Sequence, residues 1–167
     1  MKERYAHAHM RAALQYAKLS YCKDKQVGCL IVKNDRIISI GFNGMPPGWE
    51  NCCEDKTGKT HVELYHAEAN AIAKLARSTE SGEGATLFCT LAPCLICAKL
   101  LFQAGIKDVY YIEDHPKSFA GLKFLERCNL SVYRMAIEHD TTNNNNKEHT
   151  TCRLLFMRIP HSIRVFF

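Results

Sequence analysis

The sequence has no run of about 20 apolar residues, the length that a helix needs to cross a membrane, so we expect no membrane span. The opening MKERYAHAHMRAAL lacks the apolar segment of a secretory signal, and no signal is expected. Neither sign of charge dominates the sequence. Its 22 basic and 17 acidic residues give a net charge of +5, a mild excess that does not by itself indicate nucleic-acid binding. Outside the C-terminal tail, no stripe of interleaved basic and aromatic residues accompanies the single Trp49, which disfavours a polynucleotide-binding groove.

Nine cysteines could suggest a disulfide framework, but three features argue against one. Their number is odd, no secretory signal is expected, and 167 residues are enough for a sizeable core. We therefore expect free thiols and a cytoplasmic location, in the host cytoplasm if the chain is phage-encoded. Apolar residues make up 47% and charged residues 23%, which is typical of one soluble globular domain.

Two short motifs carry the chemistry: HAE at 66–68 and PCLIC at 93–97. A catalytic zinc ion needs three protein ligands and an open position for water, whose pKa then falls to about 7. His66, Cys94 and Cys97 supply three ligands of the right kind. Glu68 then remains free to move protons between water, a ring nitrogen and a leaving amine. The pair H-x-E and P-C-x-x-C marks the zinc-dependent nucleobase deaminases.

Two other interpretations of these motifs are open. A single CxxC also occurs in redox pairs and as half of a structural zinc site. A closed structural site would need a fourth Cys or His near the other three, and no second CxxC is present to supply it. The occurrence of both motifs together favours a catalytic zinc.

Hydrophobic periodicity and turn residues predict alternating helices and strands. Asn34-Asp35 separates two apolar runs as a hairpin turn would, and Gly105 ends a helix that Pro93 begins. The predicted elements are helix 3–20, strands 27–33 and 36–43, a loop over 44–61, helix 65–78, strand 85–90, helix 93–104, strand 108–113, helix 117–128 and strand 130–135. This order predicts an α/β fold, a three-layer α-β-α sandwich around a five-stranded mixed sheet. It also places the motifs at two helix N-termini that face one metal ion.

Longer segments resemble a known family. GFNGMPPG at 41–48 and NCCED at 51–55 precede HAEANAI, and with the PCLIC segment they are similar to the cytidine deaminase superfamily. Within it the chain resembles the dCMP deaminases of the phage and bacterial type, over nearly all of residues 10–135. The resemblance implies the sheet of that family and hydrolysis of dCMP to dUMP and ammonia for thymidylate synthesis. It also implies activation by dCTP, inhibition by dTTP, a homohexamer, small nucleotides as partners, and Mg²⁺ only together with a triphosphate effector.

Individual positions take roles from the same resemblance. His66, Cys94 and Cys97 match the zinc ligands, and Glu68 matches the proton shuttle. The positions that match contacts with the nucleotide are Asn43, Ala67 and Arg77, and more weakly Glu54.

The chain departs from the family after the fourth predicted strand. Many relatives carry a nucleotide-binding tyrosine there, whereas this chain has EDHPKSFAG, in which His115 and Lys117 could contact phosphate instead. Some phage relatives hold a second, structural zinc near the loop before HAE. Cys52, Cys53 and His61 are the residues that could bind it here.

Three alternatives to a dCMP deaminase follow from the same fold: a dCTP-accepting enzyme, a polynucleotide deaminase of the tRNA type, or an inactive nucleotide sensor. The intact set of Glu68 and three ligands disfavours the sensor. We expect the deaminase domain to span 1–140, followed by an Asn-rich linker and a basic, apolar tail over 141–167. The tail could dock a partner or a membrane surface, but we favour a translated vector remnant without a role in the fold.

Overall fold

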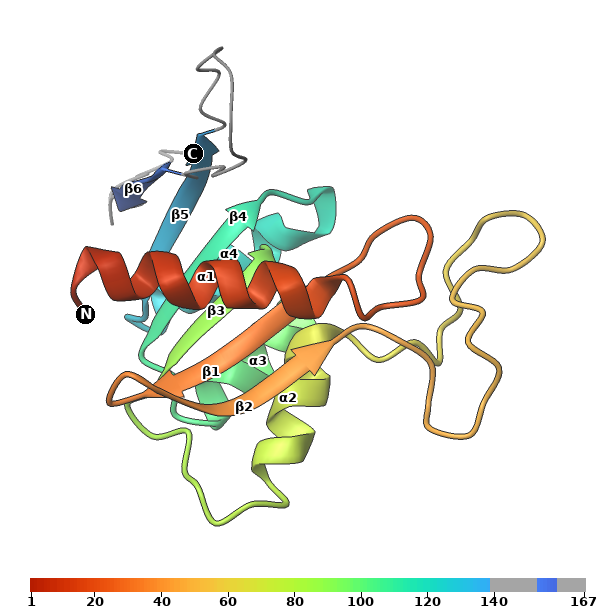
Figure 1. Cartoon of the computed structure of the whole chain (residues 1–167), viewed down its shortest axis with the longest axis horizontal. Helices are drawn as coiled ribbons and strands as arrows, with labels where there is room; N and C mark the ends of the chain where they lie inside the picture. Colours follow the sequence, from red (N-terminus) through yellow and green to blue (C-terminus); the bar gives the residue numbers. More distant parts are fainter. Residues whose placement is uncertain (139–152, 159–167) are drawn as a thin grey trace, which may run out of the picture.

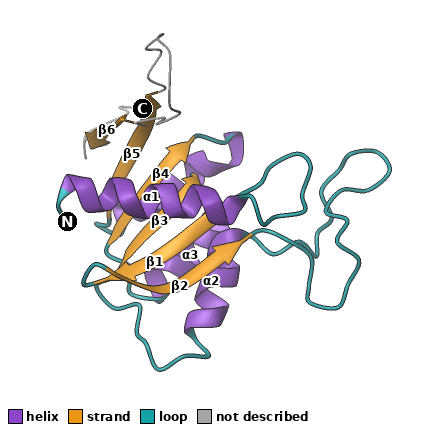
Figure 2. Ribbon diagram, in the orientation of Figure 1, coloured by secondary structure: helices purple, strands orange, loops and turns teal. Residues whose placement is uncertain are grey.

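The computed structural model describes residues 1–138 and 153–158, which form three layers around one mixed sheet (Figures 1 and 2). The sheet order is β2-β1-β3-β4-β5-β6, in which β3, β4 and β5 are parallel neighbours and the other pairs are antiparallel. The elements are α1 (Glu3–Ala17), β1 (Gly28–Lys33), β2 (Arg36–Phe42), α2 (Ala67–Leu75), β3 (Thr86–Leu91), α3 (Leu95–Gln103), β4 (Asp108–Glu113), the 3₁₀ turn η1 (Pro116–Ser118), α4 (Phe119–Arg127), β5 (Ser131–Glu138) and β6 (Arg153–Arg158). The predicted α-β-α sandwich is confirmed.

The alternation of side chains along the strands divides the core into two parts. Leu30 and Val32 face α1, together with Phe88 of β3 and Met135 of β5. The residues between them in sequence, such as Ile31, face the opposite side, where α2, α3 and α4 pack. Strands that are apolar on both faces are typical of a sheet covered by helices on both sides. One helix therefore covers one face and three helices cover the other.

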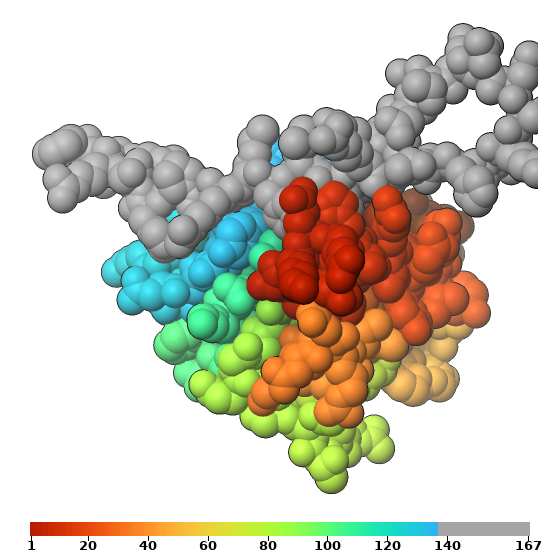
Figure 3. Space-filling model, turned by 60° about the vertical axis from the view of Figure 1, so that its left-hand side comes forward, coloured from red at the N-terminus to blue at the C-terminus, as the bar shows by residue number. Residues whose placement is uncertain are grey.

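The hairpin β1–β2 forms as predicted. Asn34 and Asp35 both adopt positive φ angles, 52° and 59°, the conformation that a two-residue type I′ turn requires. The space-filling view shows α1 (red) beside this hairpin (orange) on the outside of the molecule (Figure 3). The hairpin therefore forms one edge of the sheet and contributes to the surface on which α1 packs.

The C-terminal segment differs from our prediction. Residues 153–158 form β6, which pairs antiparallel with β5 from Tyr133↔Arg158 to Glu138↔Arg153. The sheet therefore has one strand more than the five expected, and this part of the segment has a place in the fold. The physical reason is that β5 would otherwise end the sheet with unpaired backbone groups, which an added strand satisfies. The predicted Asn-rich linker lies outside the described residues.

No described helix has the length and hydropathy that crossing a bilayer requires.

Candidate active site

The two motifs meet at the starts of two neighbouring helices. His66 is the N-cap residue of α2, and Cys94 is the N-cap residue of α3. Both have extended backbone angles, and Cys97 follows within the first turn of α3. The positive ends of the two helix dipoles therefore point at the cluster, an arrangement that favours thiolates there.

The three predicted ligands have the spacing of a zinc site. The Nδ1 atom of His66 lies 3.6 Å from Sγ of Cys94 and 3.4 Å from Sγ of Cys97. All three ligand atoms lie within 4.8 Å of one another. With Zn–N about 2.1 Å and Zn–S about 2.3 Å, ligand atoms of a tetrahedral site lie roughly 3.6 Å apart. The imidazole and two thiols therefore fit a zinc ion without rearrangement.

The pKa values of the two thiols also favour a metal site. A hydrogen bond from Cys97, joined by one from His66, lowers the pKa of Cys94 to about 3. The same hydrogen bond, with burial, raises the pKa of Cys97. The hydrogen bond with Cys94 raises the pKa of His66, while burial and the charge of Lys117 oppose it. A half-buried donor set that concentrates negative charge on sulfur suits a soft divalent cation.

Glu68 lies beside the ligands without joining them. Its side chain is almost fully buried, with 4% exposed, and its oxygens are not part of the ligand cluster. Burial raises the pKa of this carboxyl above its ordinary value. A buried carboxyl with a raised pKa next to a metal site can both accept and return a proton.

A pocket opens directly above this cluster. Its lining includes His66, Ala67, Glu68 and Cys94, together with the predicted residues Asn43, Glu54, His115 and Lys117. The loop before β1 adds Cys22, Asp24 and Lys25. Residues that lie far apart in the sequence, and that were predicted separately, therefore share one cavity.

Asn43 uses both of its polar groups within the protein. Its side-chain oxygen accepts a hydrogen bond from the backbone N–H of Val27 at 2.8 Å, and its amide nitrogen donates to the carbonyl of Lys25 at 2.8 Å. The side chain is 6% exposed and lines the pocket. Asn43 therefore holds the loop before β1 against the end of β2, whatever contact it makes with a bound molecule.

His115 and Lys117 line the pocket from the segment that follows β4. Nδ1 of His115 accepts a hydrogen bond from the backbone N–H of Lys117 at 3.1 Å and caps the turn η1. Within the described part of the chain, no carboxylate forms an ion pair with Lys117. Lys25, the other pocket lysine, is paired with Glu113 at 2.8 Å. Lys117 is thus the pocket cation available to an anionic ligand.

Arg77 does not share this pocket. It is exposed just beyond the C-terminal end of α2, whereas His66 caps the N-terminal end. The nine residues of α2 between them rise about 14 Å. Arg77 is therefore not among the residues that line the described pocket, and its predicted contact with the nucleotide stays a prediction.

The predicted trio for a second zinc does not form. Cys53 is joined to Cys22 by a disulfide, and the thiol of Cys52 donates to the carbonyl of Glu54 at 3.2 Å. In the part of the chain that the structure describes, the ligand atoms of Cys52, Cys53 and His61 do not cluster, whereas those of Cys22, Cys53 and Glu54 do. The expectation that all thiols are free was also wrong for this pair, because Cys22 lies beside Cys53 in the folded chain. No sequence signal distinguished Cys22 from the other cysteines.

Two glycines that the sequence analysis missed position the ligand-bearing helices. A Cβ on Gly41 of β2 would collide with the carbonyl oxygen of Ala67, at the start of α2. A Cβ on Gly121 of α4 would collide with the carbonyl oxygen of Pro93 and lie 2.7 Å from the carbonyl carbon of Cys94. Each glycine therefore permits a close backbone approach next to a zinc ligand. In the sequence, they are single glycines in a strand and a helix, where a close backbone contact is one established reason for glycine.

The chain is similar to known deaminases over most of its described length. Residues 3–113 match the family model described as the cytidine and deoxycytidylate deaminase zinc-binding region. The deoxycytidylate deaminase of Enterobacteria phage T4 is 33% identical, with 75% of this chain and 87% of that protein covered. The deoxycytidylate deaminase of Saccharomyces cerevisiae is 32% identical over 78% of this chain, which spans only 45% of the yeast protein.

A solved structure agrees with this similarity. The dCMP deaminase of the cyanophage S-TIM5, crystallised with dCMP and dUMP, is 40% identical and has a TM-score of 0.77. The match covers 81% of this chain and 99% of that one. The fold, the ligand cluster and these relatives lead to one conclusion: the chain belongs to the zinc-binding cytidine and deoxycytidylate deaminase family.

Proposed function

We propose that the chain is a zinc-dependent hydrolase that deaminates dCMP to dUMP and releases ammonia. The observation that carries this proposal is the convergence of three zinc ligands and a buried, non-ligating Glu68 beside one pocket, whose lining also includes Lys117, a lysine without an ion pair among the described residues. The cyanophage dCMP deaminase, of similar fold and crystallised with dCMP and dUMP, supports the choice of substrate.

His66, Cys94 and Cys97 would hold the zinc ion, which supplies an activated water molecule for attack on C4 of the cytosine ring. Glu68 accepts the proton that this water gives up and passes it to the ring nitrogen N3. Glu68 then carries the proton of the new C4 hydroxyl to the exocyclic amine, so that the C4–N bond breaks, ammonia leaves and C4 becomes a carbonyl. Burial suits Glu68 to both roles, because its raised pKa lies closer to neutral pH than that of an exposed carboxyl.

The rest of the pocket selects the nucleotide. Ala67 is fully buried and lines the pocket, where its backbone can contact the base of the substrate. Asn43 holds the loop 22–27 at the sugar side, and Lys117 with His115 receives the 5′-phosphate. A charge-assisted hydrogen bond to such a phosphate contributes about 1.5–3 kcal/mol, which favours a nucleotide over a nucleoside.

Regulation and assembly complete the proposal. We expect activation by dCTP and inhibition by dTTP, with Mg²⁺ bound only together with a triphosphate, and a homohexamer in solution. Apolar side chains exposed on and beside α3 support self-association: Ile96, Leu100, Phe102 and Phe119 are 71%, 39%, 42% and 64% exposed. Exposed apolar groups of this size favour burial against another chain.

A substrate panel tests this function. Zinc-loaded protein is incubated with dCMP, dCTP, CMP and deoxycytidine, each alone and with added dCTP or dTTP, and ammonia release is measured. The expected order places dCMP first, with deoxycytidine weaker by at least about tenfold in kcat/KM. Equal use of dCMP and deoxycytidine would contradict a nucleotide enzyme, and preferred use of dCTP would identify the triphosphate as the substrate.

A further inference from the structure

Two loops that leave the same end of the sheet form the rim of the pocket. One links α1 to β1 over residues 18–27, and the other links β2 to α2 over residues 43–66 (Figure 1). The first contributes Cys22, Asp24 and Lys25 to the pocket lining, and the second contributes Asn43, Glu54, Thr60 and Leu64. The Cys22–Cys53 disulfide joins the two loops across 31 positions of the sequence.

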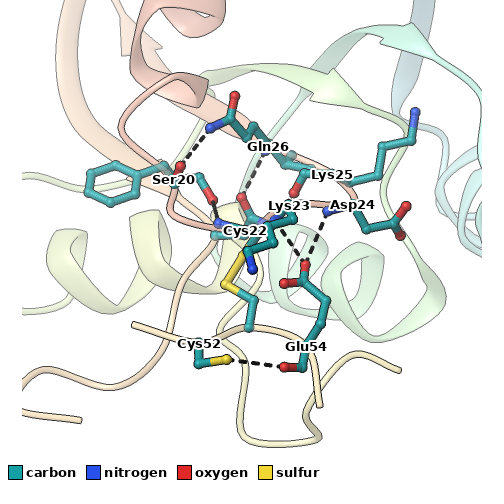
Figure 4. Close-up of a disulfide and its surroundings, with 12 residues drawn as sticks. Ser20, Cys22, Lys23, Asp24, Lys25, Gln26, Cys52 and Glu54 are labelled. Carbon is teal, nitrogen blue, oxygen red and sulfur yellow. Dashed lines mark hydrogen bonds between the residues drawn. A yellow bond between two sulfur atoms is a disulfide. The ribbon is translucent and has the colours of Figure 1, made fainter. Parts of the chain in front are cut away.

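Hydrogen bonds next to the disulfide connect the same two loops (Figure 4). One carboxylate oxygen of Glu54 accepts from the backbone N–H groups of Lys23 and Asp24, at 3.0 Å and 3.2 Å. At the other end of this segment, the side-chain amide of Asn43 donates a hydrogen bond to the carbonyl oxygen of Lys25. The short segment 23–25 is therefore fixed between the disulfide and Glu54 on one side and Asn43 on the other.

Most described backbone hydrogen bonds of the second loop, such as those from the N–H of Asp55 to Lys59 and from the N–H of His61 to Cys53, are local to the loop itself. Within residues 43–66, its described regular pairings are the single bridges Gly44↔Tyr65 and Glu54↔Thr60, and most of its side chains are exposed. Cys53 is an exception, being 1% exposed. A cross-link at this position limits the freedom of a long loop that the rest of the fold holds weakly. The ligand cluster is independent of it, because His66, Cys94 and Cys97 are held by α2 and α3.

We propose that Cys22 and Cys53 form a redox-controlled clasp that closes the rim of the pocket as a disulfide and releases it as two thiols. Cys22 lines the pocket and is 4% exposed, whereas Cys53 is 1% exposed and does not line it, so we place the attack of a small thiol on Sγ of Cys22. The thiolate of that reductant attacks Sγ of Cys22, the Cys22–Cys53 bond breaks, and Cys53 leaves as a thiolate that takes up a proton. A second reductant thiolate attacks the mixed disulfide and leaves with the first as a disulfide, while Cys22 takes up a proton. Two electrons pass from the reductant to the protein, and an oxidised thiol reverses the sequence.

Release of the clasp acts on substrate binding and leaves the chemistry in place. The segment with Asp24 and Lys25 loses its covalent anchor, whereas Glu68 and the ligand cluster keep theirs. Reduction should therefore raise KM for the nucleotide and change kcat little. This readout rests on the proposed deaminase function, so the test also includes a readout that is independent of activity.

The test uses the full chain, loaded with zinc, in buffers of oxidised or reduced glutathione. Mass spectrometry after thiol blocking reports the Cys22–Cys53 cross-link, and limited trypsin digestion reports cleavage after Lys23, Lys25, Lys56 and Lys59. In the reduced buffer, we expect the cross-link to disappear, cleavage to speed up by about tenfold, and KM for dCMP to rise by about threefold or more. The variants C22S and C53S should behave in both buffers like the reduced wild type. C52S, which removes the exposed neighbouring thiol, should respond like the wild type.

Three results would overturn the clasp. One is the absence of the cross-link in every glutathione buffer. Another is equal cleavage and equal KM in the two buffers while the cross-link forms and breaks. The third is a second zinc equivalent per chain that is lost in both C22S and C53S, because the thiols would then be metal ligands. If the chain does not act on dCMP, the cleavage pattern still decides the matter, so failure of the clasp and failure of the proposed function are separable.

Discussion

Gly121 packs directly against the backbone of Cys94, where α4 passes the start of α3: a Cβ at position 121 would lie 2.7 Å from the carbonyl carbon of Cys94. The position of a zinc ligand thus depends on a residue 27 positions further along the chain, which has no side chain to contribute. Gly41 has the same relation to Ala67, next to His66.

The first prediction follows from this contact. G121A should displace Cys94 and weaken zinc binding by about 10- to 100-fold, the range typical of residues that support metal ligands. Zinc retention during titration with a chelator measures the effect. G44A is a matched control, because a Cβ there meets nothing within 4 Å and Gly44 has no positive φ. Equal zinc affinity in G121A and the wild type would mean that α4 can shift at no cost to the site.

The second prediction concerns the phosphate. K117A should lower kcat/KM for dCMP by about tenfold or more, since one charge-assisted hydrogen bond is lost, and should leave the value for deoxycytidine nearly unchanged. Steady-state kinetics with both substrates measures this difference. K18A removes an exposed lysine at the end of α1 and serves as the control. An equal loss on both substrates would assign Lys117 a structural role instead.

The third prediction concerns acid sensitivity. His9 lies on the buried face of α1, its ring lies 5.4 Å from that of Phe88, and its Nε2 atom has no hydrogen-bond partner among the described residues. Burial lowers the pKa of His9 below its ordinary value of 6.5. The unfolded chain therefore binds a proton more readily than the folded one, and stability falls as the pH drops below about 6.5. Well above that pH the group is neutral in both states and has no effect.

Denaturant unfolding at pH 7.5 and pH 5.5 measures this dependence. H9L should lose less stability between the two values than the wild type, because the titrating group is gone. H61L removes an imidazole from the loop before α2 and serves as the control. The same pH dependence in H9L and the wild type would show that other groups cause the acid sensitivity.

The fourth prediction concerns β6. Deletion of residues 141–167 removes the strand paired with β5 and exposes the backbone edge of β5. We expect Tm to fall by about 4 °C or more, as about 1 kcal/mol corresponds to several degrees in a domain of this size, while bound zinc stays at one per chain. Deletion of 159–167 alone keeps β6 and should leave Tm nearly unchanged. An unchanged Tm in the longer deletion would support our original expectation that the tail is dispensable.

Most of the fold follows from local signals in the sequence. The Asn34-Asp35 turn, the alternation of Leu30 and Ile31 between the two faces, and the end of α3 before Gly105 each have a local physical cause. The start of α3 lies two residues later than predicted, because Cys94 is the N-cap residue and Pro93 precedes it. The zinc cluster was predictable because its ligands lie in two short motifs at helix starts. These features depend on residues close together in the sequence.

The features that the sequence did not indicate depend on contacts between distant segments. Cys22 meets Cys53 only because two loops leave the sheet at the same end, and Lys25 reaches the pocket through the same arrangement. Gly121 is needed because the backbone of Pro93 and Cys94 passes too close for a side chain at position 121. Strand β6 forms because β5 would otherwise be an unpaired edge of the sheet. No local pattern carries this information.

The most direct test of the account compares wild-type protein with E68Q, both loaded with zinc and supplied with dCMP. Product analysis follows dUMP and ammonia, and atomic absorption measures zinc per chain. The account predicts that the wild type forms dUMP and ammonia in equal amounts. E68Q should keep about one zinc per chain while its turnover falls by at least about 100-fold. Absence of dCMP deamination by the wild type, loss of zinc from E68Q, or wild-type turnover in E68Q would each contradict it.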